Sequence, residues 1–118
     1  MTPAFPSEPG IEVTPEQTQQ AITDGRAILV DVREDYEWEA GRIDGSEHIE
    51  LERLASKSDE LPKDTTLIFS CRLGARSAMA AEAFRAAGFD AWSMAGGLER
   101  WHDEDRPLVP EGGAVADH

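Results

Sequence analysis

The chain has 118 residues, enough for one domain with a single modest core. Its 24 acidic and 11 basic residues give a formal net charge of −13, which argues against binding to nucleic acid or an anionic membrane. A single cysteine, Cys71, excludes an internal disulfide, and neither a signal peptide nor a membrane span is evident, so we expect a cytoplasmic protein.

In chain order, the first half predicts strands that alternate with helices. Residues 1–10 contain three prolines and predict a flexible N-terminal arm. Ile11 and Val13 predict a short strand, after which Thr14 and Gln17 fit a capping box at the start of a helix. Further elements expected here are the end of that helix at Gly25, a buried strand over 27–32, a short helix over 34–41 and a short strand over 46–51.

The second half continues the alternation. It predicts a helix over 51–61, a strand over 65–70, an alanine-rich helix over 75–88, a strand over 89–94, a helical turn over 96–101 and a polar tail over 109–118. Alternating strands and helices predict an α/β domain over 11–108, with a mainly parallel sheet flanked by helices on both faces.

Cys71 follows the predicted strand over 65–70 and precedes a helix, which is where open α/β sheets bind ligands. Gly74 permits a tight turn whose N–H groups converge on one point, and the following helix adds its positive end. Arg72 and Arg76 add full charges, so each feature favours a thiolate in a small anion pocket. Free cysteines are more often small buried hydrophobes, but these neighbours favour a nucleophile.

The length of this loop separates two chemistries. Cysteine phosphatases use Cys-x5-Arg, which wraps a tetrahedral phosphate, whereas Cys71 and Arg76 form Cys-x4-Arg. The shorter loop makes a tighter cradle, better suited to one extra sulfur atom in a persulfide anion.

Three stretches together resemble the single-domain rhodanese family over about residues 11–108. They are "LVDVREDYEWEAGRIDGSEHI" (29–49), the loop "CRLGARS" (71–77) and "MAGGLERW" (94–101). The resemblance implies a five-stranded, mainly parallel sheet and transfer of a sulfane sulfur through a Cys71 persulfide. Arg42 stands where the family usually has histidine, and the stretch around His48 also departs from the family pattern.

The resemblance also implies roles for the residues around the thiol. The donor would be thiosulfate or a similar small anion, the acceptor cyanide or a thiol, and no metal or organic cofactor would be needed. The backbone of the loop would cradle the persulfide, and its two arginines would receive the donor. The expected substrate-binding residues are Arg72, Leu73, Gly74, Ala75, Arg76 and Ser77.

Five more residues are expected to support this loop. Asp31 and Arg33 follow a central strand and are interpreted as a buried ion pair, with Glu37 as a partner for Arg33. Gly96 and Gly97 predict a tight turn that brings the last helix close to the loop. His48 and His102 have no histidine or cysteine at ligand spacing, so we predict no metal site.

Three other functions stay open at this point. One is a sulfur-relay or persulfide-sensing module whose donor or acceptor is a protein. Another is a phosphatase or arsenate reductase, against which the loop length argues, and the last is a binding domain without activity. Sulfur uptake from thiosulfate by the wild type, absent from Cys71→Ser, would separate the sulfurtransferase from the binding domain without activity.

Overall fold

A computed structural model describes Phe5 and residues 10–118 of the chain. Its centre is a five-stranded sheet in the order β1-β5-β4-β2-β3, and every pair of neighbouring strands is parallel. The strands are β1 (Glu12–Val13), β2 (Ala27–Asp31), β3 (Glu47–His48), β4 (Thr66–Ser70) and β5 (Ala91–Met94). The predicted fold class is therefore confirmed, with a sheet that is parallel throughout.

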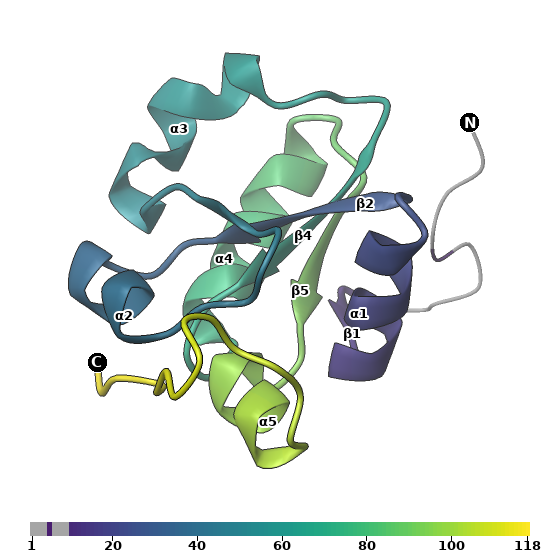
Figure 1. Ribbon diagram of the computed structural model, residues 1–118. Coiled ribbons are helices and arrows are strands. Elements are labelled where there is room, and N and C mark those ends of the chain that lie inside the picture. The colour runs from purple at the N-terminus through teal and green to yellow at the C-terminus, as the bar shows by residue number, and fades with distance from the viewer. Residues whose placement is uncertain (1–4, 6–9) are drawn as a thin grey trace.

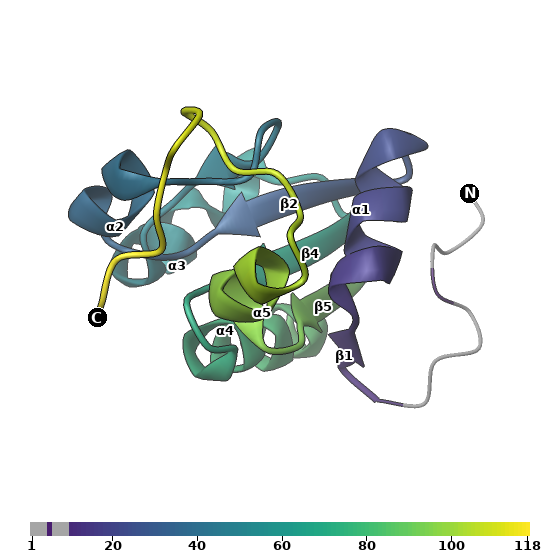
Figure 2. The same cartoon turned by 60° about the horizontal axis from the view of Figure 1, so that its bottom comes forward.

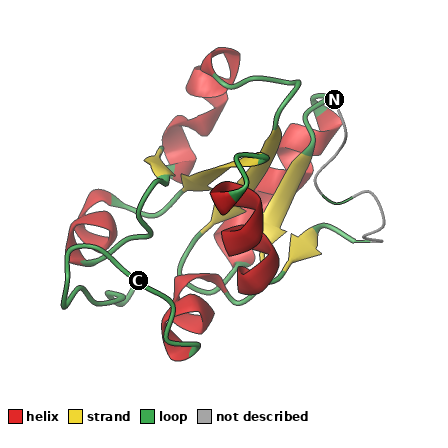
Figure 3. Ribbon diagram, turned by 45° about the vertical axis from the view of Figure 1, so that its right-hand side comes forward, coloured by secondary structure: helices red, strands yellow, loops and turns green. Residues whose placement is uncertain are grey.

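Helices cover both faces of this sheet, as Figures 1 and 3 show. They are α1 (Pro15–Thr23), α2 (Asp35–Ala40), α3 (Leu54–Lys57), α4 (Ala75–Ala86) and α5 (Gly97–Asp103). Short 3₁₀ turns, η1 (Leu51–Arg53) and η2 (Ser58–Glu60), flank α3. None of the helices in the described part of the chain combines the length and apolarity needed to cross a bilayer.

The central strand β4 is buried along its whole length and divides the core into two clusters. Successive side chains of a strand point to opposite faces of the sheet. Leu67 and Phe69 accordingly join the cluster that includes Leu54 of α3 and Phe84 of α4. Ile68 joins the other cluster, which contains side chains from α1 and α5. Burial on both faces fixes β4 firmly, and the site described below begins where it ends.

Local signals in the sequence set several element boundaries. Thr14 caps α1 through a complete capping box with Gln17, as predicted. The predicted single helix over 51–61 is wrong, because this stretch forms η1, α3 and η2 in succession. These turns bury only Leu54, so little packing energy favours one continuous helix.

Both ends of the chain reach the folded domain. Residues 1–4 and 6–9 of the predicted N-terminal arm lie outside the described residues, but Phe5 packs edge-on against Trp92 with ring centroids 5.3 Å apart. The C-terminal segment runs past α5 toward α2, as Figure 2 shows. It is held there by backbone bonds of 2.7 and 2.9 Å between Val109 and Arg42, and by one of 2.9 Å from Ala114 to Ala40.

Candidate active site

Cys71 lies directly after β4, at the carboxyl edge of the sheet. Its sulfur accepts hydrogen bonds from the backbone N–H groups of Gly74, at 3.1 Å, and Ser77, at 3.4 Å. The residue is only 1% exposed, and it also belongs to the hydrophobic cluster that contains Leu67 and Phe69. Two backbone amide donors thus converge on the sulfur, an arrangement typical of an anion-binding nest.

The shape of the loop depends on Gly74. This glycine has φ +110°, a left-handed conformation that residues with a Cβ adopt only under strain, and it is the N-cap of α4. The first-turn N–H groups of a helix have no intrahelical acceptor, and one of them, from Ser77, is directed at the sulfur. The positive end of the twelve-residue helix α4 therefore faces Cys71.

Helix α5 holds the loop from behind. The N–H groups of Leu98 and Glu99 donate to the carbonyl oxygens of Cys71, at 2.8 Å, and Arg72, at 3.1 Å. In a trans peptide the N–H points opposite to the carbonyl, so these bonds turn the N–H groups of Arg72 and Leu73 away from α5. A Cβ on Gly97 would lie 2.4 Å from both carbonyl oxygens, so only glycine permits this contact.

A pair of buried hydroxyl groups lies beside the sulfur. The Oγ atom of Ser77 is 3.4 Å from the sulfur of Cys71, 3.1 Å from the carbonyl oxygen of Gly74 and 2.7 Å from the Oγ atom of Ser93 on β5. Both serines are fully buried. The sequence pointed to Ser77 through the loop motif, whereas no motif singled out Ser93.

Arg76 does not extend freely into the pocket. Its guanidinium donates two hydrogen bonds, of 2.9 and 3.0 Å, to the carboxylate of Glu37 on α2. Burial alone would raise the pKa of Glu37, but the bonds from Arg76 and from the Glu34 backbone outweigh it and hold this pKa below its usual value. The hydrogen bonds that Arg76 donates to Glu37 raise the pKa of Arg76. The pair therefore joins α2 to α4 beside the loop.

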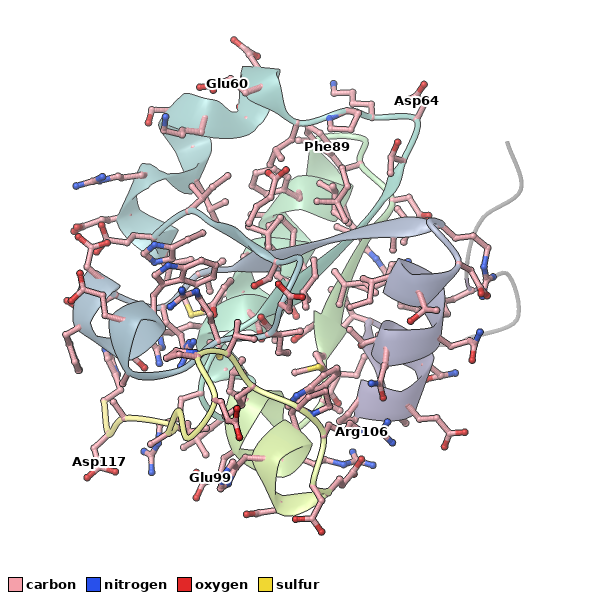
Figure 4. The ribbon with its side chains drawn as sticks, in the orientation of Figure 1. Glu60, Asp64, Phe89, Glu99, Arg106 and Asp117 are labelled. Carbon is pink, nitrogen blue, oxygen red and sulfur yellow. The ribbon has the colours of Figure 1, made fainter. Side chains whose placement is uncertain are left out.

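Arg72 is also paired with carboxylates. Its guanidinium lies 3.4 Å from Glu99 of α5 and 3.3 Å from Asp117 of the C-terminal segment, residues labelled in Figure 4. Tyr36 donates a hydrogen bond of 3.0 Å to the backbone carbonyl of Asp117. The C-terminal segment thus forms one wall of the site, which the sequence did not predict.

A pocket of about 390 Å³ opens next to the loop. It is lined by Val32, Glu34, Glu50, Leu51, Glu52, Arg76 and His118. Three glutamates and one arginine already paired with Glu37 make this rim acidic. Small anions that enter this pocket therefore meet carboxylates, in addition to the negative net charge of the whole chain.

Asp31 and Arg33 form the predicted buried ion pair. Arg33 donates from Nε and Nη2 to the carboxylate of Asp31, at 2.8 to 3.0 Å, and from Nη2 to the Gly41 carbonyl at 2.8 Å. The predicted pairing of Arg33 with Glu37 is wrong, because α2 directs Glu37 toward Arg76. The ion pair ties the end of β2 to the end of α2.

His48 and His118 lie outside the active-site loop. The Nε2 atom of His48 lies 2.7 Å from the Arg33 carbonyl oxygen, and its ring stacks on Trp38 with centroids 4.7 Å apart. Ligand atoms of Glu34, Glu37 and His118 lie within 4.8 Å of one another. Both oxygens of Glu37 already accept bonds from Arg76, so this group is part of the ion-pair network.

An α/β domain that aims backbone amides at one cysteine, at the carboxyl edge of a parallel sheet, defines a class of cysteine-dependent enzymes. Residues 14–104 match the model of the rhodanese-like domain, and the chain belongs to that family of sulfurtransferases.

Two curated relatives and one solved structure illustrate the family. The chain is 33% identical to "Thiosulfate sulfurtransferase GlpE" of Ectopseudomonas mendocina, over 75% of this chain and 82% of that protein. It is 35% identical to "Probable adenylyltransferase/sulfurtransferase MoeZ" of Mycobacterium tuberculosis over 83% of this chain, but spans only 26% of that protein. The crystal structure of a rhodanese-related protein from Thermoplasma volcanium superposes with a TM-score of 0.79 at 28% identity, covering 85% of this chain and 98% of the other.

Proposed function

We propose that the protein transfers a sulfane sulfur from thiosulfate, or a similar donor, to a thiophilic acceptor through a persulfide on Cys71. The observation that carries this proposal is the pair of amides of Gly74 and Ser77, which donate to the sulfur. Hydrogen bonds to an anion favour its formation, and the same amides suit a persulfide anion. Similarity to a thiosulfate sulfurtransferase supports this donor.

The reaction balances as two displacements. The thiolate of Cys71 attacks the outer sulfur of thiosulfate, a new S–S bond forms, and the S–S bond of thiosulfate breaks as sulfite leaves with the electron pair. Cyanide, or a thiolate acceptor, then attacks the outer sulfur of the persulfide. The thiolate of Cys71 leaves with its electron pair, so the enzyme returns unchanged and thiocyanate or a new persulfide is released.

Mass spectrometry of the intact protein tests the first displacement. The wild type treated with thiosulfate gains the mass of one sulfur atom, and cyanide removes it with formation of thiocyanate. Cys71→Ser gains nothing. Equal thiocyanate formation by the two proteins would defeat the proposal.

A second candidate is a relay that receives its sulfur from a protein persulfide. The acidic rim supports it, because both loop arginines are already paired with carboxylates and a thiosulfate dianion gains little attraction from them. Slow uptake from thiosulfate combined with rapid uptake from a cysteine desulfurase carrying a persulfide would favour this candidate. Hydrolysis of an aryl phosphate would instead point to phosphatase chemistry, which the Cys-x4-Arg loop disfavours.

A further inference from the structure

Ser93 is the one residue of the buried hydroxyl pair that does not belong to the active-site loop. It lies on β5, is fully buried, and has its Oγ atom 2.7 Å from that of Ser77. Its backbone N–H is engaged with the Ile11 carbonyl at 2.8 Å, which fixes the residue between two strands. In the part of the chain that the structure describes, the hydrogen-bonded path from the Ser93 hydroxyl to the sulfur of Cys71 passes through Ser77.

Counting protons shows what this arrangement allows. A serine hydroxyl donates once and accepts twice. Around the hydroxyl of Ser77 lie the sulfur of Cys71, the Gly74 carbonyl and the hydroxyl of Ser93. With a thiol, the S–H donates to Ser77, and Ser77 donates to Gly74. With a thiolate, the Ser77 proton must turn to the sulfur. The Gly74 carbonyl still accepts from the Ala78 N–H at 3.0 Å, so this turn leaves no carbonyl unpaired.

We propose that Ser93 is a positioning residue for sulfur transfer, which donates its proton to Ser77 and thereby directs the Ser77 hydroxyl toward the ionised sulfur. Chains of hydrogen bonds strengthen one another in a buried site, and a bond to a charged acceptor is stronger than one to a neutral acceptor. Donation from Ser93 therefore stabilises the thiolate more than the thiol. The role rests on Cys71 acting as the nucleophile of the proposed function.

Ser70 provides a matched comparison within the same sheet. It is also a fully buried serine at the end of a central strand, and it directly precedes Cys71. Within Phe5 and residues 10–118, its Oγ atom has no hydrogen-bond partner. Ser70→Ala thus removes the same hydroxyl from an equally buried position without touching the Ser93–Ser77–Cys71 chain.

The test measures the rate of Cys71 alkylation by iodoacetamide against pH, together with the ultraviolet absorbance of the thiolate. Neither measurement requires a sulfur donor, so the outcome is independent of which donor the enzyme uses. Ser93→Ala is expected to move the midpoint of both profiles upward by about 0.5 pH unit, and Ser77→Ala by about one unit. Ser70→Ala is expected to leave the midpoint unchanged.

Two further variants distinguish an effect through the hydrogen-bond chain from a packing defect. Adding Ser93→Ala to Ser77→Ala is expected to leave the pH midpoint of the Ser77→Ala variant unchanged, because the hydroxyl that links Ser93 to the sulfur is already missing. Ser93→Thr keeps a hydroxyl and is expected to keep the midpoint, even where crowding lowers the free energy of unfolding. An unchanged midpoint in Ser93→Ala, or an equal shift with and without the Ser77 hydroxyl, overturns the proposal.

Discussion

The ion pair between Arg76 and Glu37 predicts an asymmetric and pH-dependent loss of stability. Arg76→Ala leaves the carboxylate of Glu37 fully buried without its bidentate partner. Glu37→Gln instead leaves the guanidinium of Arg76, which is 19% exposed and still has an amide oxygen to bond. Removing the arginine is therefore expected to cost more than neutralising the glutamate.

The magnitude follows from the burial of the carboxylate. Removing one partner of a buried pair costs about 3–5 kcal/mol, and the partial exposure of Arg76 favours the lower end, about 3 kcal/mol at neutral pH. Glu37→Gln is expected to cost about 1–2 kcal/mol, because its amide oxygen still accepts a bond. Since domains are stable by about 5–15 kcal/mol, both variants should fold.

The pH dependence has a definite sign. Because the pKa of Glu37 is lowered in the folded wild type, the stabilisation by the pair is present at neutral pH and is lost only as pH falls below the ordinary glutamate value. Without Arg76, burial raises the pKa of Glu37, so the variant recovers stability as the buried carboxylate takes up a proton. The difference from wild type should therefore narrow as pH falls from neutral toward the ordinary glutamate value.

Urea unfolding followed by tryptophan fluorescence measures this difference at each pH. Arg53→Ala is the matched control, because it removes an arginine that is 62% exposed and should leave stability nearly unchanged throughout this pH range. The reasoning is refuted if Arg76→Ala costs no more than Glu37→Gln, or if its cost stays constant with pH.

Three further expectations concern other parts of the chain. Asp117→Asn removes a carboxylate 3.3 Å from a loop guanidinium, so the KM for thiosulfate should fall about two- to threefold in a steady-state assay, while Asp103→Asn has no such effect. Gly97→Ala should lower the free energy of unfolding in urea by about 3 kcal/mol or more and abolish rapid alkylation of the thiol, because its Cβ would collide with the loop backbone. Gly25→Ala has a similar φ of +70° but open space around it, so it should lower the free energy of unfolding by only about 1 kcal/mol. Thr14→Ala removes a helix cap and should lower the free energy of unfolding by about 1 kcal/mol without changing sulfur uptake, measured by mass spectrometry.

Local signals explain which parts of the fold the sequence predicts well. Thr14 and Gln17 exchange side-chain to backbone hydrogen bonds across only four residues. The strand that ends at Ser70 is apolar enough to require burial on both faces. The position of Cys71 follows from these elements, because the strand before it and the helix after it are both strongly encoded. Features that depend on residues close together in the sequence are the ones that sequence patterns predict.

Contacts between distant segments are harder to predict. The sequence favours Arg33 as the partner of Glu37, whereas the orientation of α2 places the carboxylate of Glu37 against Arg76. Ser93 belongs to no recognisable sequence motif, so its contact with Ser77 could not be predicted. Asp117 belongs to a tail without a periodic pattern, so its contact with Arg72 could not be predicted either. Such choices depend on how elements pack in three dimensions, which neither propensity nor spacing records.

The backing of the active-site loop by α5 has a consequence for biosynthesis. Residues 97–99 leave the ribosome after Cys71, and until their amides reach the loop the carbonyl groups of Cys71 and Arg72 lack the donors that hold the loop against α5. We therefore expect the cysteine of a nascent chain to behave like that of an ordinary peptide. Nucleophilic power would then appear only as the last helix docks, so that an unfinished polypeptide is protected from oxidants and stray electrophiles.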